Sequence, residues 1–507
     1  MRHDWGRTRK QRSPLHALLL WMAVASFVIG IIVRVLAGHN DLWFDEVWTL
    51  QLLRERAHSF GDVFTNLKHD NNHHLCALWM WLVGQNASAS VYRLPSVLAS
   101  IGTIVVAGLI GLRQSRLAGY IAVILTSWSY LLVHYGTEAR GYSLVIFFAL
   151  LAWYALQQFE ETRSRIWIIL FWSAVVLGFL AHLEFAICFA GLVAWALWRC
   201  LRYRSKWRRA VVDLFALFTV PIVLMLVFYF VSIRGMKILG EPGYYRVTSL
   251  LIKTGSYTLG GPGSGAAAGI IALLGVAALG LTLIYLKYDR DDRWIFYAVV
   301  IIAPLAAIAI DRPAQLHLHY IMILRYLMIS VAMSLLLFSS ACATTLRQGV
   351  AGLTIGVAVL AMYVTGNAAN TVNLLQFGRG QYLAALLFME THSNDKKVLI
   401  TSNADLGIGM LVNYYKSYLN RPDDLQYVDQ AALKEDYART NGLSLGAEWL
   451  ILFRDDLTKQ PSRVIDEYGN RYQLVTIYRG SDLSGSNWLL YHNLNRGQMA
   501  PQNPLLQ

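Results

Sequence analysis

Long apolar runs separated by short charged links occupy most of the chain, and they are centred near residues 26, 101, 126, 149, 173, 192, 221, 276, 302, 335 and 358. Since a membrane-spanning helix needs about 20 apolar residues, the pattern predicts an α-helical polytopic membrane protein with about eleven spans. The stretch 166–198 would be roughly 50 Å long as one helix, so we expect two short spans there. The turn between them holds His182 and Glu184, and polar groups at that depth are expected to face a cavity inside the protein.

The loop between the first two runs, about residues 38–90, has a helical periodicity of its own. Val47, Leu50 and Leu53 recur at helical spacing, which is typical of an amphipathic helix that lies on the bilayer surface. Further along the loop, the apolar piece 75–83 is too short to span the membrane and is predicted to be interfacial or re-entrant.

Charged and turn residues become frequent after the last apolar run. The strand-like stretches KVLITS, WLILF, YQLVTIY and WLLYH alternate there with helical patterns, which predicts a small α/β domain. We therefore divide the chain into a transmembrane domain, residues 1–366, and an outer α/β domain, residues 367–507.

Composition and charge support a membrane protein. The chain is 56% hydrophobic and 15% charged, with a mean hydropathy of +0.42, whereas soluble proteins are about 25% charged. The net charge of +13 does not indicate a nucleic-acid partner, because the basic residues cluster in links between spans, where membrane lipids attract them. Their distribution predicts an N-terminus in the cytoplasm and a C-terminal domain outside the inner membrane, in the periplasm or extracellular space.

Neither a zinc site nor a nucleotide site is indicated by short motifs. The four cysteines, Cys76, Cys188, Cys200 and Cys342, are scattered through apolar runs without metal-ligand spacing, which argues against a disulfide framework or structural zinc. Walker and Rossmann fingerprints are also missing from the sequence.

An acidic pair, Asp45 and Glu46, follows the first span among Trp43, Phe44 and Trp48. A carboxylate whose pKa is raised by apolar neighbours suits a general base that takes the proton of an attacking hydroxyl. The alternative is that both carboxylates stabilise the N-terminus of the next helix through its dipole. Spacing alone does not separate these two interpretations.

The polar stretch DNNHHL, residues 70–75, lies in the same loop and includes His73 and His74. Its side chains could orient a sugar or a carboxylate. Together with Asp45 or Glu46, a histidine could also contribute to the three protein ligands that a catalytic metal needs. The alternative is that both histidines are only solvated at the membrane interface.

Two arginines, Arg140 and Arg325, lie in turns on the same predicted side of the membrane. Arginine binds phosphate oxygens bidentately, so the pair could clamp a lipid-linked phosphate. The alternative is that each reaches lipid headgroups from a helix end, as Arg34 at the end of the first span also could. The two stretches hold further polar candidates: Glu138, Tyr142, His317, His319 and Tyr326.

Five motifs in this order resemble the GT-C integral membrane glycosyltransferases, in the branch related to protein O-mannosyltransferases and the lipid A aminoarabinose transferase. They are LWFDE after the first span, NNHHL in the same loop, YRLPSVLAS at the second span, EARGYSL at the fourth and RYLM at the tenth. The resemblance covers roughly residues 15–345 and implies a GT-C fold for the transmembrane domain.

The resemblance implies an enzyme that transfers a sugar, with inversion, from a polyprenyl-phosphate donor to a lipid, glycan or protein acceptor on the outer face of the membrane. By this resemblance Asp45 matches the catalytic acidic residue of the first loop, which would act as the base, and Glu46 matches a neighbour that helps to place the acceptor. The positions that match donor-phosphate contacts are Arg140, Tyr142, Arg325 and Tyr326. His73 aligns with the family histidine, and we add four substrate-binding candidates: His74, Glu138, His182 and Glu184. No cofactor is implied, and a divalent cation stays open, because relatives with lipid-monophosphate donors generally work without the one that oligosaccharide transferases need.

Two other functional classes stay open at this point. A transporter or flippase of lipid-linked sugars would also have many spans and buried arginines, although its charges would tend to lie near the midplane. An O-antigen ligase or polymerase would be expected to carry its main outer loop late in the chain. The sugar and the acceptor depend on the shape of the pocket, which the sequence does not give.

Overall fold

The computed structural model describes residues 14–68, 73–202, 207–237, 247–314, 324–393, 397–440, 445–458 and 460–496. The chain forms two compact units. Unit 1 comprises Met1–Val35, Phe64–Leu78 and Arg93–Ala369, and unit 2 comprises Leu36–Val63, Trp79–Tyr92 and Asn370–Gln507. Each unit is described by itself below.

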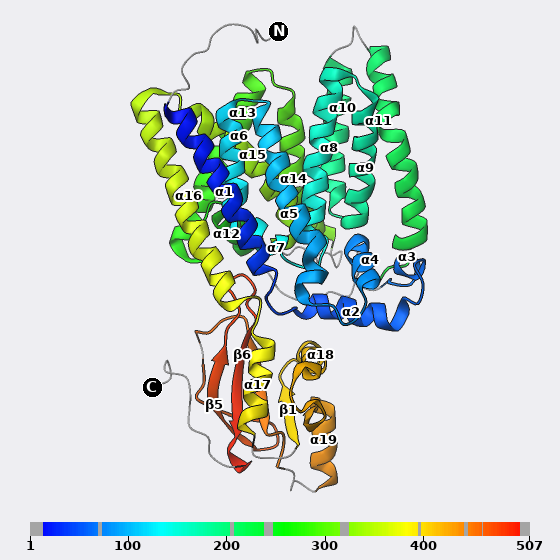
Figure 1. The fold of residues 1–507 in the computed structure, drawn as a ribbon, viewed down its shortest axis with the longest axis vertical. Helices are drawn as coiled ribbons and strands as arrows, with labels where there is room; N and C mark the ends of the chain where they lie inside the picture. Colours follow the sequence, from blue (N-terminus) through cyan, green and yellow to red (C-terminus); the bar gives the residue numbers. More distant parts are fainter. Residues whose placement is uncertain are drawn as a thin grey trace. The chain divides into compact units, whose positions relative to one another are not determined.

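Unit 1 is a bundle of helices (Figure 1). Its helices are α1 (Pro14–Ala37), α5 (Ala89–Leu112), α6 (Arg116–Trp128), α7 (Tyr130–Gly136), α8 (Tyr142–Thr162), α9 (Arg165–Ala181), α10 (Phe185–Arg202), α11 (Trp207–Phe228) with a π-helical turn (Tyr229–Ile233), α12 (Val247–Thr258), α13 (Gly265–Tyr288), α14 (Arg293–Ala314), a 3-10 turn (Leu324–Leu327), α15 (Met328–Thr345) and α16 (Gly349–Phe377).

The multi-span membrane fold is confirmed. Within the described part of the chain, eight helices are long and apolar enough to cross a membrane, and the bent pair α6 and α7 would make a ninth. Two further runs that we expected to span form other helices. One forms α9, which is apolar but only 17 residues long. The other lies in α14, a helix of 22 residues whose segment Arg293–Leu305 is apolar. The expected division of stretch 166–198 into two helices is also confirmed, by α9 and α10.

Helices α8 and α15 form the centre of unit 1. In their most apolar windows 78% and 72% of the residues are buried inside the protein, against 28% for α1 and 17% for the span Arg208–Ile233. Because apolar residues of the outer helices stay exposed, these helices present the surface that suits lipid, while α8 and α15 hold the core that positions the polar side chains described below.

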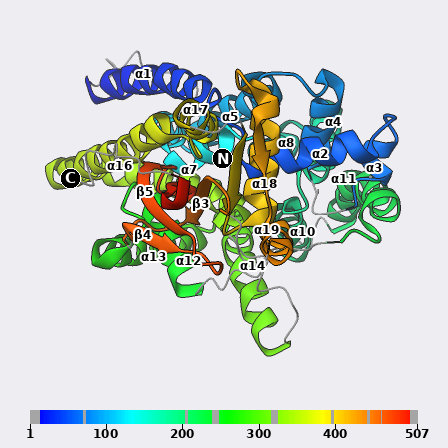
Figure 2. The ribbon, with the colours of Figure 1, turned by 90° about the horizontal axis from the view of Figure 1, so that it is seen from below.

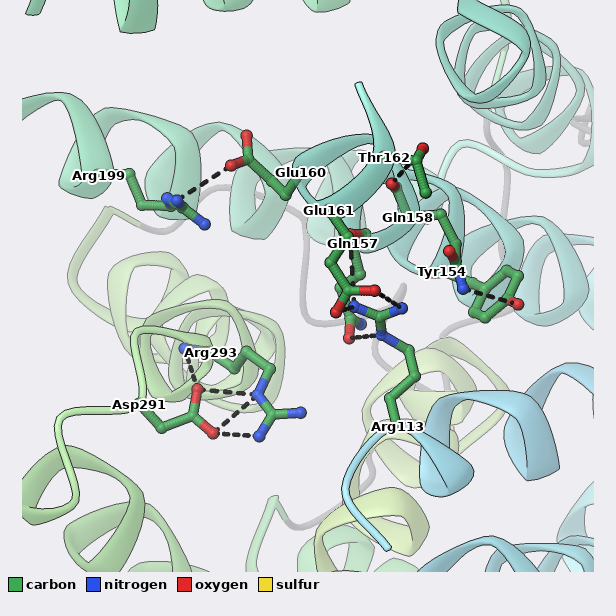
Figure 3. A network of polar contacts seen from close by, with 10 residues as sticks. All are labelled: Arg113, Tyr154, Gln157, Gln158, Glu160, Glu161, Thr162, Arg199, Asp291 and Arg293. Carbon is green, nitrogen blue, oxygen red and sulfur yellow. Dashed lines mark hydrogen bonds and ion pairs between the residues drawn. The ribbon is translucent and has the colours of Figure 1, made fainter. Parts of the chain in front are cut away.

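The C-terminal end of α8 carries ion pairs to its neighbours (Figure 3). Arg113, after α5, pairs with Glu161 and donates a hydrogen bond from Nε to the side-chain oxygen of Gln157 at 3.0 Å. Arg199 of α10 pairs with Glu160 at 3.0 Å. This end of α8 lies roughly 30 Å from its first residue at 1.5 Å per residue, so these contacts hold the helices at the end of the bundle that lies away from Tyr142.

Unit 2 contains a six-stranded mixed sheet with the strand order β2-β1-β3-β6-β5-β4. Its strands are β1 (Val398–Ser402), β2 (Leu425–Tyr427), β3 (Trp449–Arg454), β4 (Arg463–Ile465), β5 (Arg471–Tyr478) and β6 (Asn487–Asn493). Strand β1 pairs in parallel with β2 and β3, and the remaining pairs are antiparallel. The predicted small α/β domain is therefore confirmed.

Three helices accompany the sheet: α17 (Tyr382–His392), α18 (Asp405–Tyr415) and α19 (Gln430–Arg439). Figure 1 places α18 and α19 on the side of β1, away from β5, and Figure 2 shows both helices on the side of the sheet away from β4 and β5. A cluster of buried residues covers one face of β3, β5 and β6, and its members are Leu450, Leu452, Tyr472, Leu474, Leu489 and Tyr491. They alternate along β3 with residues of the other face, as a two-sided sheet requires.

The segment between α1 and α5 forms α2 (Phe44–Arg56), α3 (Asp62–Thr65) and α4 (His74–Val83). The predicted apolar stripe of α2 exists, but it faces the interior of the protein and not lipid. Val47, Leu50 and Leu53 are each only 2% exposed within the protein itself. Helix α2 packs against α18, which lies more than 300 residues later in the chain. The local sequence pattern of α2 does not predict this contact.

Candidate functional site

A group of polar side chains meets inside unit 1, and we call it the polar cluster. It consists of His73, Arg140, Tyr142, His182, Arg325 and Tyr326. These residues come from the start of α4, the turn before α8, the end of α9 and the 3-10 turn before α15. Four segments that are far apart in the sequence therefore supply one site.

The aromatic rings hold the polar cluster together. The ring centres of His73 and His182 are 4.7 Å apart, and that of Tyr142 lies 5.1 Å from His73 and 5.2 Å from His182. The ring of Tyr326 stacks on His182 at 5.6 Å. The guanidinium of Arg325 lies 5.9 Å from the Tyr142 ring centre and 5.6 Å from that of Tyr326, which is within the range of a cation–π contact.

The position of His73 is fixed by the backbone of the turn before α8. Its Nδ1 accepts a hydrogen bond from the Gly141 N–H at 3.0 Å. Residue 141 has to be glycine for this contact, because a Cβ there would overlap the carbonyl oxygen of Ala181 and come within 2.8 Å of His73 Nδ1. A neutral imidazole that accepts through Nδ1 carries its proton on Nε2. That Nε2 has no hydrogen-bond partner among the described residues, so it remains a donor for a ligand.

His182 repeats this arrangement at the end of α9. Its Nδ1 accepts the backbone N–H of Glu184 at 3.0 Å, and its Nε2 has no partner in the described ranges. One carboxyl oxygen of Glu184 accepts the N–H of Ile329 at 3.4 Å. The turn between α9 and α10 thus presents a second imidazole N–H donor next to that of His73.

Burial keeps both imidazoles neutral. It lowers the pKa of His73 well below the ordinary 6.5, and the nearby positive charge of Arg140 lowers it further. Burial also lowers the pKa of His182 to about 3, with added effects of Arg140 and Arg325. The same burial raises the pKa of Glu184 to about 8. At neutral pH the cluster therefore combines two arginine charges with uncharged histidine and tyrosine donors, which is an arrangement that suits an anion.

His74, adjacent to His73, lies among apolar rings instead. It stacks on Phe64 with ring centres 5.8 Å apart and contacts the edge of Phe228 at 4.9 Å. Burial lowers its pKa to about 4. Glu138 is 1% exposed in the turn that carries Arg140.

The acidic pair lies in unit 2, at the start of α2. The carboxylate of Glu46 accepts the backbone N–H of Trp43 at 3.0 Å and caps the helix, and the residue is fully buried. Asp45 is half-buried, and its backbone carbonyl accepts the hydroxyl of Thr49 at 3.0 Å. Close by, the guanidinium of Arg379 lies 6.0 Å from the Trp43 ring centre. The geometry thus assigns a helix-capping role to Glu46.

Some sequence-predicted residues lie outside the described residues, namely Asp70, Asn71, Asn72, His317 and His319. Within the ranges that the structure describes, no group of three His, Cys, Asp or Glu side chains is placed to hold a metal ion.

Comparison with solved structures identifies the fold. No protein-family model and no curated protein matches the chain. The apo crystal structure of ArnT from Cupriavidus metallidurans matches over 94% of this chain and 98% of its own, with 13% identity and a TM-score of 0.52. ArnT is a GT-C glycosyltransferase. The chain has the GT-C fold.

Two further structures with this fold resemble the chain at lower TM-scores. ArnT bound to undecaprenyl phosphate has a TM-score of 0.47 at 14% identity and covers 96% of this chain and 99% of its own. The Archaeoglobus fulgidus oligosaccharyltransferase in complex with Zn and sulfate has a TM-score of 0.47 at 12% identity and covers 85% and 68%.

Sequence reasoning missed two residues that build the site in this GT-C fold. Gly141 gives His73 its backbone partner, and Ser96 of α5 donates its hydroxyl to the Arg140 carbonyl at 3.1 Å. Both lie inside the motifs EARGYSL and YRLPSVLAS. Both residues therefore lie in motifs that the sequence singles out, but the structural role of a small residue becomes clear only when its neighbours in space are known.

Proposed function

We propose that this protein is a glycosyltransferase that moves a sugar from a polyprenyl-phosphate donor to a lipid, glycan or protein acceptor at the outer face of the inner membrane. The observation that carries the proposal is the polar cluster, in which two arginines accompany imidazole and phenol donors in a buried site. Such a set matches a phosphate whose negative charge grows as the sugar leaves it. The GT-C fold shared with ArnT supports the same reaction class.

Each residue has a defined role in the proposed reaction. Arg140 and Arg325 neutralise the donor phosphate, while the Nε2–H groups of His73 and His182 donate hydrogen bonds to its oxygens. The acceptor hydroxyl oxygen bonds to the anomeric carbon as the bond from that carbon to the phosphate oxygen breaks. The electron pair of the broken bond stays on the phosphate, and Asp45 takes the hydroxyl proton.

The proposal is tested by sugar transfer from a radiolabelled polyprenyl-phosphate sugar to membrane glycolipid extracts, with the purified protein in detergent. We expect Asp45→Asn to reduce the rate at least 100-fold, because general-base catalysis contributes about that much. The matched control is Glu55→Gln, which removes an exposed carboxylate from the same helix. Equal rates for the parent and folded Asp45→Asn would refute the role of Asp45, and the same assay with EDTA decides whether a divalent cation is needed.

Transport is the second candidate, because the apolar helix pair α6 and α7 is bent by 57° at a break, and discontinuous helices also occur in transporters. Reconstitution into vesicles with a fluorescent polyprenyl-phosphate sugar separates the two functions. Movement of the lipid between leaflets without any transfer product would favour the transporter over the enzyme.

A further inference from the structure

The break between α6 and α7 leaves backbone groups without helical partners. The two helices meet at Ser129 with a bend of 57°. The Ser129 side chain accepts the N–H of Leu132 at 3.4 Å, which caps the start of α7. The carbonyl groups of Thr126 and Ser127, at the end of α6, have no continuing helix to bind. Inside a membrane such groups cost several kcal/mol each unless the protein itself satisfies them.

Arg34 of α1 satisfies the carbonyl groups at the break. Its Nη2 donates to the Thr126 carbonyl at 2.9 Å and its Nη1 to the Ser127 carbonyl at 3.1 Å. Its Nε donates to the hydroxyl of Ser100 on α5 at 2.7 Å. Arg34 is 0% exposed, so the alternative that it contacts lipid headgroups is wrong. Its charge is held inside the bundle because the broken helix offers it acceptors.

Helix α16 supplies the rest of the support. The hydroxyl of Tyr363 donates to the Leu125 carbonyl at 2.7 Å, and the side-chain oxygen of Asn367 accepts the N–H of Tyr130 at 2.8 Å. The amide of Asn367 in turn donates to the Tyr363 carbonyl at 2.9 Å. We call Arg34, Tyr363 and Asn367 the break clamp. The break clamp binds backbone groups on both sides of the break. Its residues come from α1, which precedes the break in the sequence, and from α16, which follows it.

The break clamp is linked to the polar cluster through α7. Ser100, which accepts from Arg34, donates to the carbonyl of Leu132 on α7 at 3.3 Å. At the end of α7, Gly136 lies so close to Ser100 that a Cβ would overlap the serine side chain. Only the turn 137–141 then separates α7 from α8, and this turn carries Arg140 and Gly141. The direction of α7 therefore sets where Arg140 and the partner of His73 lie.

We propose that Arg34 is a positioning residue for the anion site, which acts by fixing the broken helix and thereby the turn 137–141. The choice of ligand in the test rests on the proposed function. A residue with a structural task alone would change how much protein folds. A positioning residue changes the affinity of the protein that does fold, together with the local dynamics of the turn.

The test compares Arg34→Met and Arg34→Lys with a matched control, Trp172→Phe. Trp172 donates its indole N–H to the Ala216 and Leu217 carbonyls, so the control also removes partly buried hydrogen bonds between helices of unit 1. Binding of polyprenyl phosphate to folded, monodisperse protein in detergent is measured by calorimetry. We expect about tenfold weaker binding for Arg34→Met, about threefold for Arg34→Lys, which keeps part of the donor set, and less than twofold for Trp172→Phe.

Hydrogen exchange of the segment 129–141 provides a readout without any ligand. We expect faster exchange in Arg34→Met and unchanged exchange in Trp172→Phe. If Arg34→Met does not fold, Tyr363→Phe, which removes one hydroxyl, takes its place with an expected threefold loss of affinity. Parental affinity and parental exchange in the Arg34 or Tyr363 variant would overturn the inference. A parent that binds no polyprenyl phosphate would overturn the proposed function instead, and exchange would still decide the role of the break clamp.

Discussion

His73 and His182 share one arrangement although they come from unrelated segments. Each accepts a backbone N–H through Nδ1, from Gly141 and Glu184 respectively. Each therefore directs an Nε2–H donor away from the backbone. Neutral imidazoles of this kind add hydrogen bonds to an anion without adding a charge that would have to be buried, while Arg140 and Arg325 supply the charge.

The buried titrating groups predict how stability depends on pH. Folded Glu184 keeps its proton up to about pH 8, whereas the unfolded chain releases it near 4.5, so its contribution to stability falls as pH rises through this range. His182 acts in the opposite sense, because the unfolded chain binds a proton below 6.5 and the folded protein only near 3. His73, with its lowered pKa, has the same sign as His182.

We therefore expect the unfolding temperature in detergent to rise towards pH 6.5 and to fall by about 2 °C between pH 6.5 and 8. The side chain of the Glu184→Gln variant cannot ionise. This variant is therefore expected to lose the fall in unfolding temperature above pH 6.5 and to keep the rise below it. Differential scanning fluorimetry across this pH range measures both proteins. Parallel curves for parent and variant above pH 6.5 would contradict the assignment to Glu184.

At the scale of elements, helix ends and breaks decide where polar groups lie. Helix α9 ends at His182 because the chain turns there to begin α10, and α6 breaks from α7 at Ser129 because Arg34, Tyr363 and Asn367 bind the freed backbone groups. Helix α2 begins at Phe44 under the cap of Glu46. Each of these ends brings a charged or hydrogen-bonding group into the protein interior.

The cap of α2 separates the roles of the two adjacent carboxylates. Glu46→Leu loses the acceptor for the Trp43 N–H and is expected to lower the free energy of unfolding by about 1 kcal/mol. Glu46→Gln keeps an acceptor oxygen and is expected to lose less than half of that. Thermal unfolding of the purified variants measures both changes, and Asp45→Asn serves as the control with near-parental stability but little transfer. A larger loss of stability in Asp45→Asn than in Glu46→Leu would reverse the assignment.

At the scale of the whole molecule, the chain combines a helical unit with GT-C architecture and a unit built around a mixed sheet. The polar cluster is made entirely by unit 1 and the acidic pair belongs to unit 2. The two ends of the bundle also differ, since the polar cluster lies at the start of α8 and the ion pairs of Arg113 and Arg199 lie at its C-terminal end (Figure 3).

The excess of arginine at the C-terminal end of α8 predicts the orientation in the membrane. Positive links stay in the cytoplasm, so the sheet-containing C-terminal region is expected outside. Alkaline phosphatase fused to the C-terminus should be active in intact cells, whereas green fluorescent protein at the same position should stay dark after export by the general secretion route. If the green fluorescent protein fusion is fluorescent and the alkaline phosphatase fusion is inactive, the C-terminus lies in the cytoplasm.

The sequence alone determined the elements, because apolar length and periodicity report burial residue by residue. It determined a multi-span helical fold, the two short helices around His182 and Glu184, and the strands of the C-terminal domain. The sequence does not distinguish the adjacent His73 and His74, since both have the same local pattern. Only packing placed His73 beside Gly141 and His74 beside Phe64 and Phe228.

The tertiary structure alone decided which distant groups meet. The stripe of α2 was expected on the bilayer and lies inside the protein, because α18 covers it. Arg34 was compatible with a headgroup contact and instead binds a broken helix more than 90 residues further along. Hydrophobic pattern specifies that a residue is buried, but its partner depends on which helices pack together, and this information is spread over the whole chain.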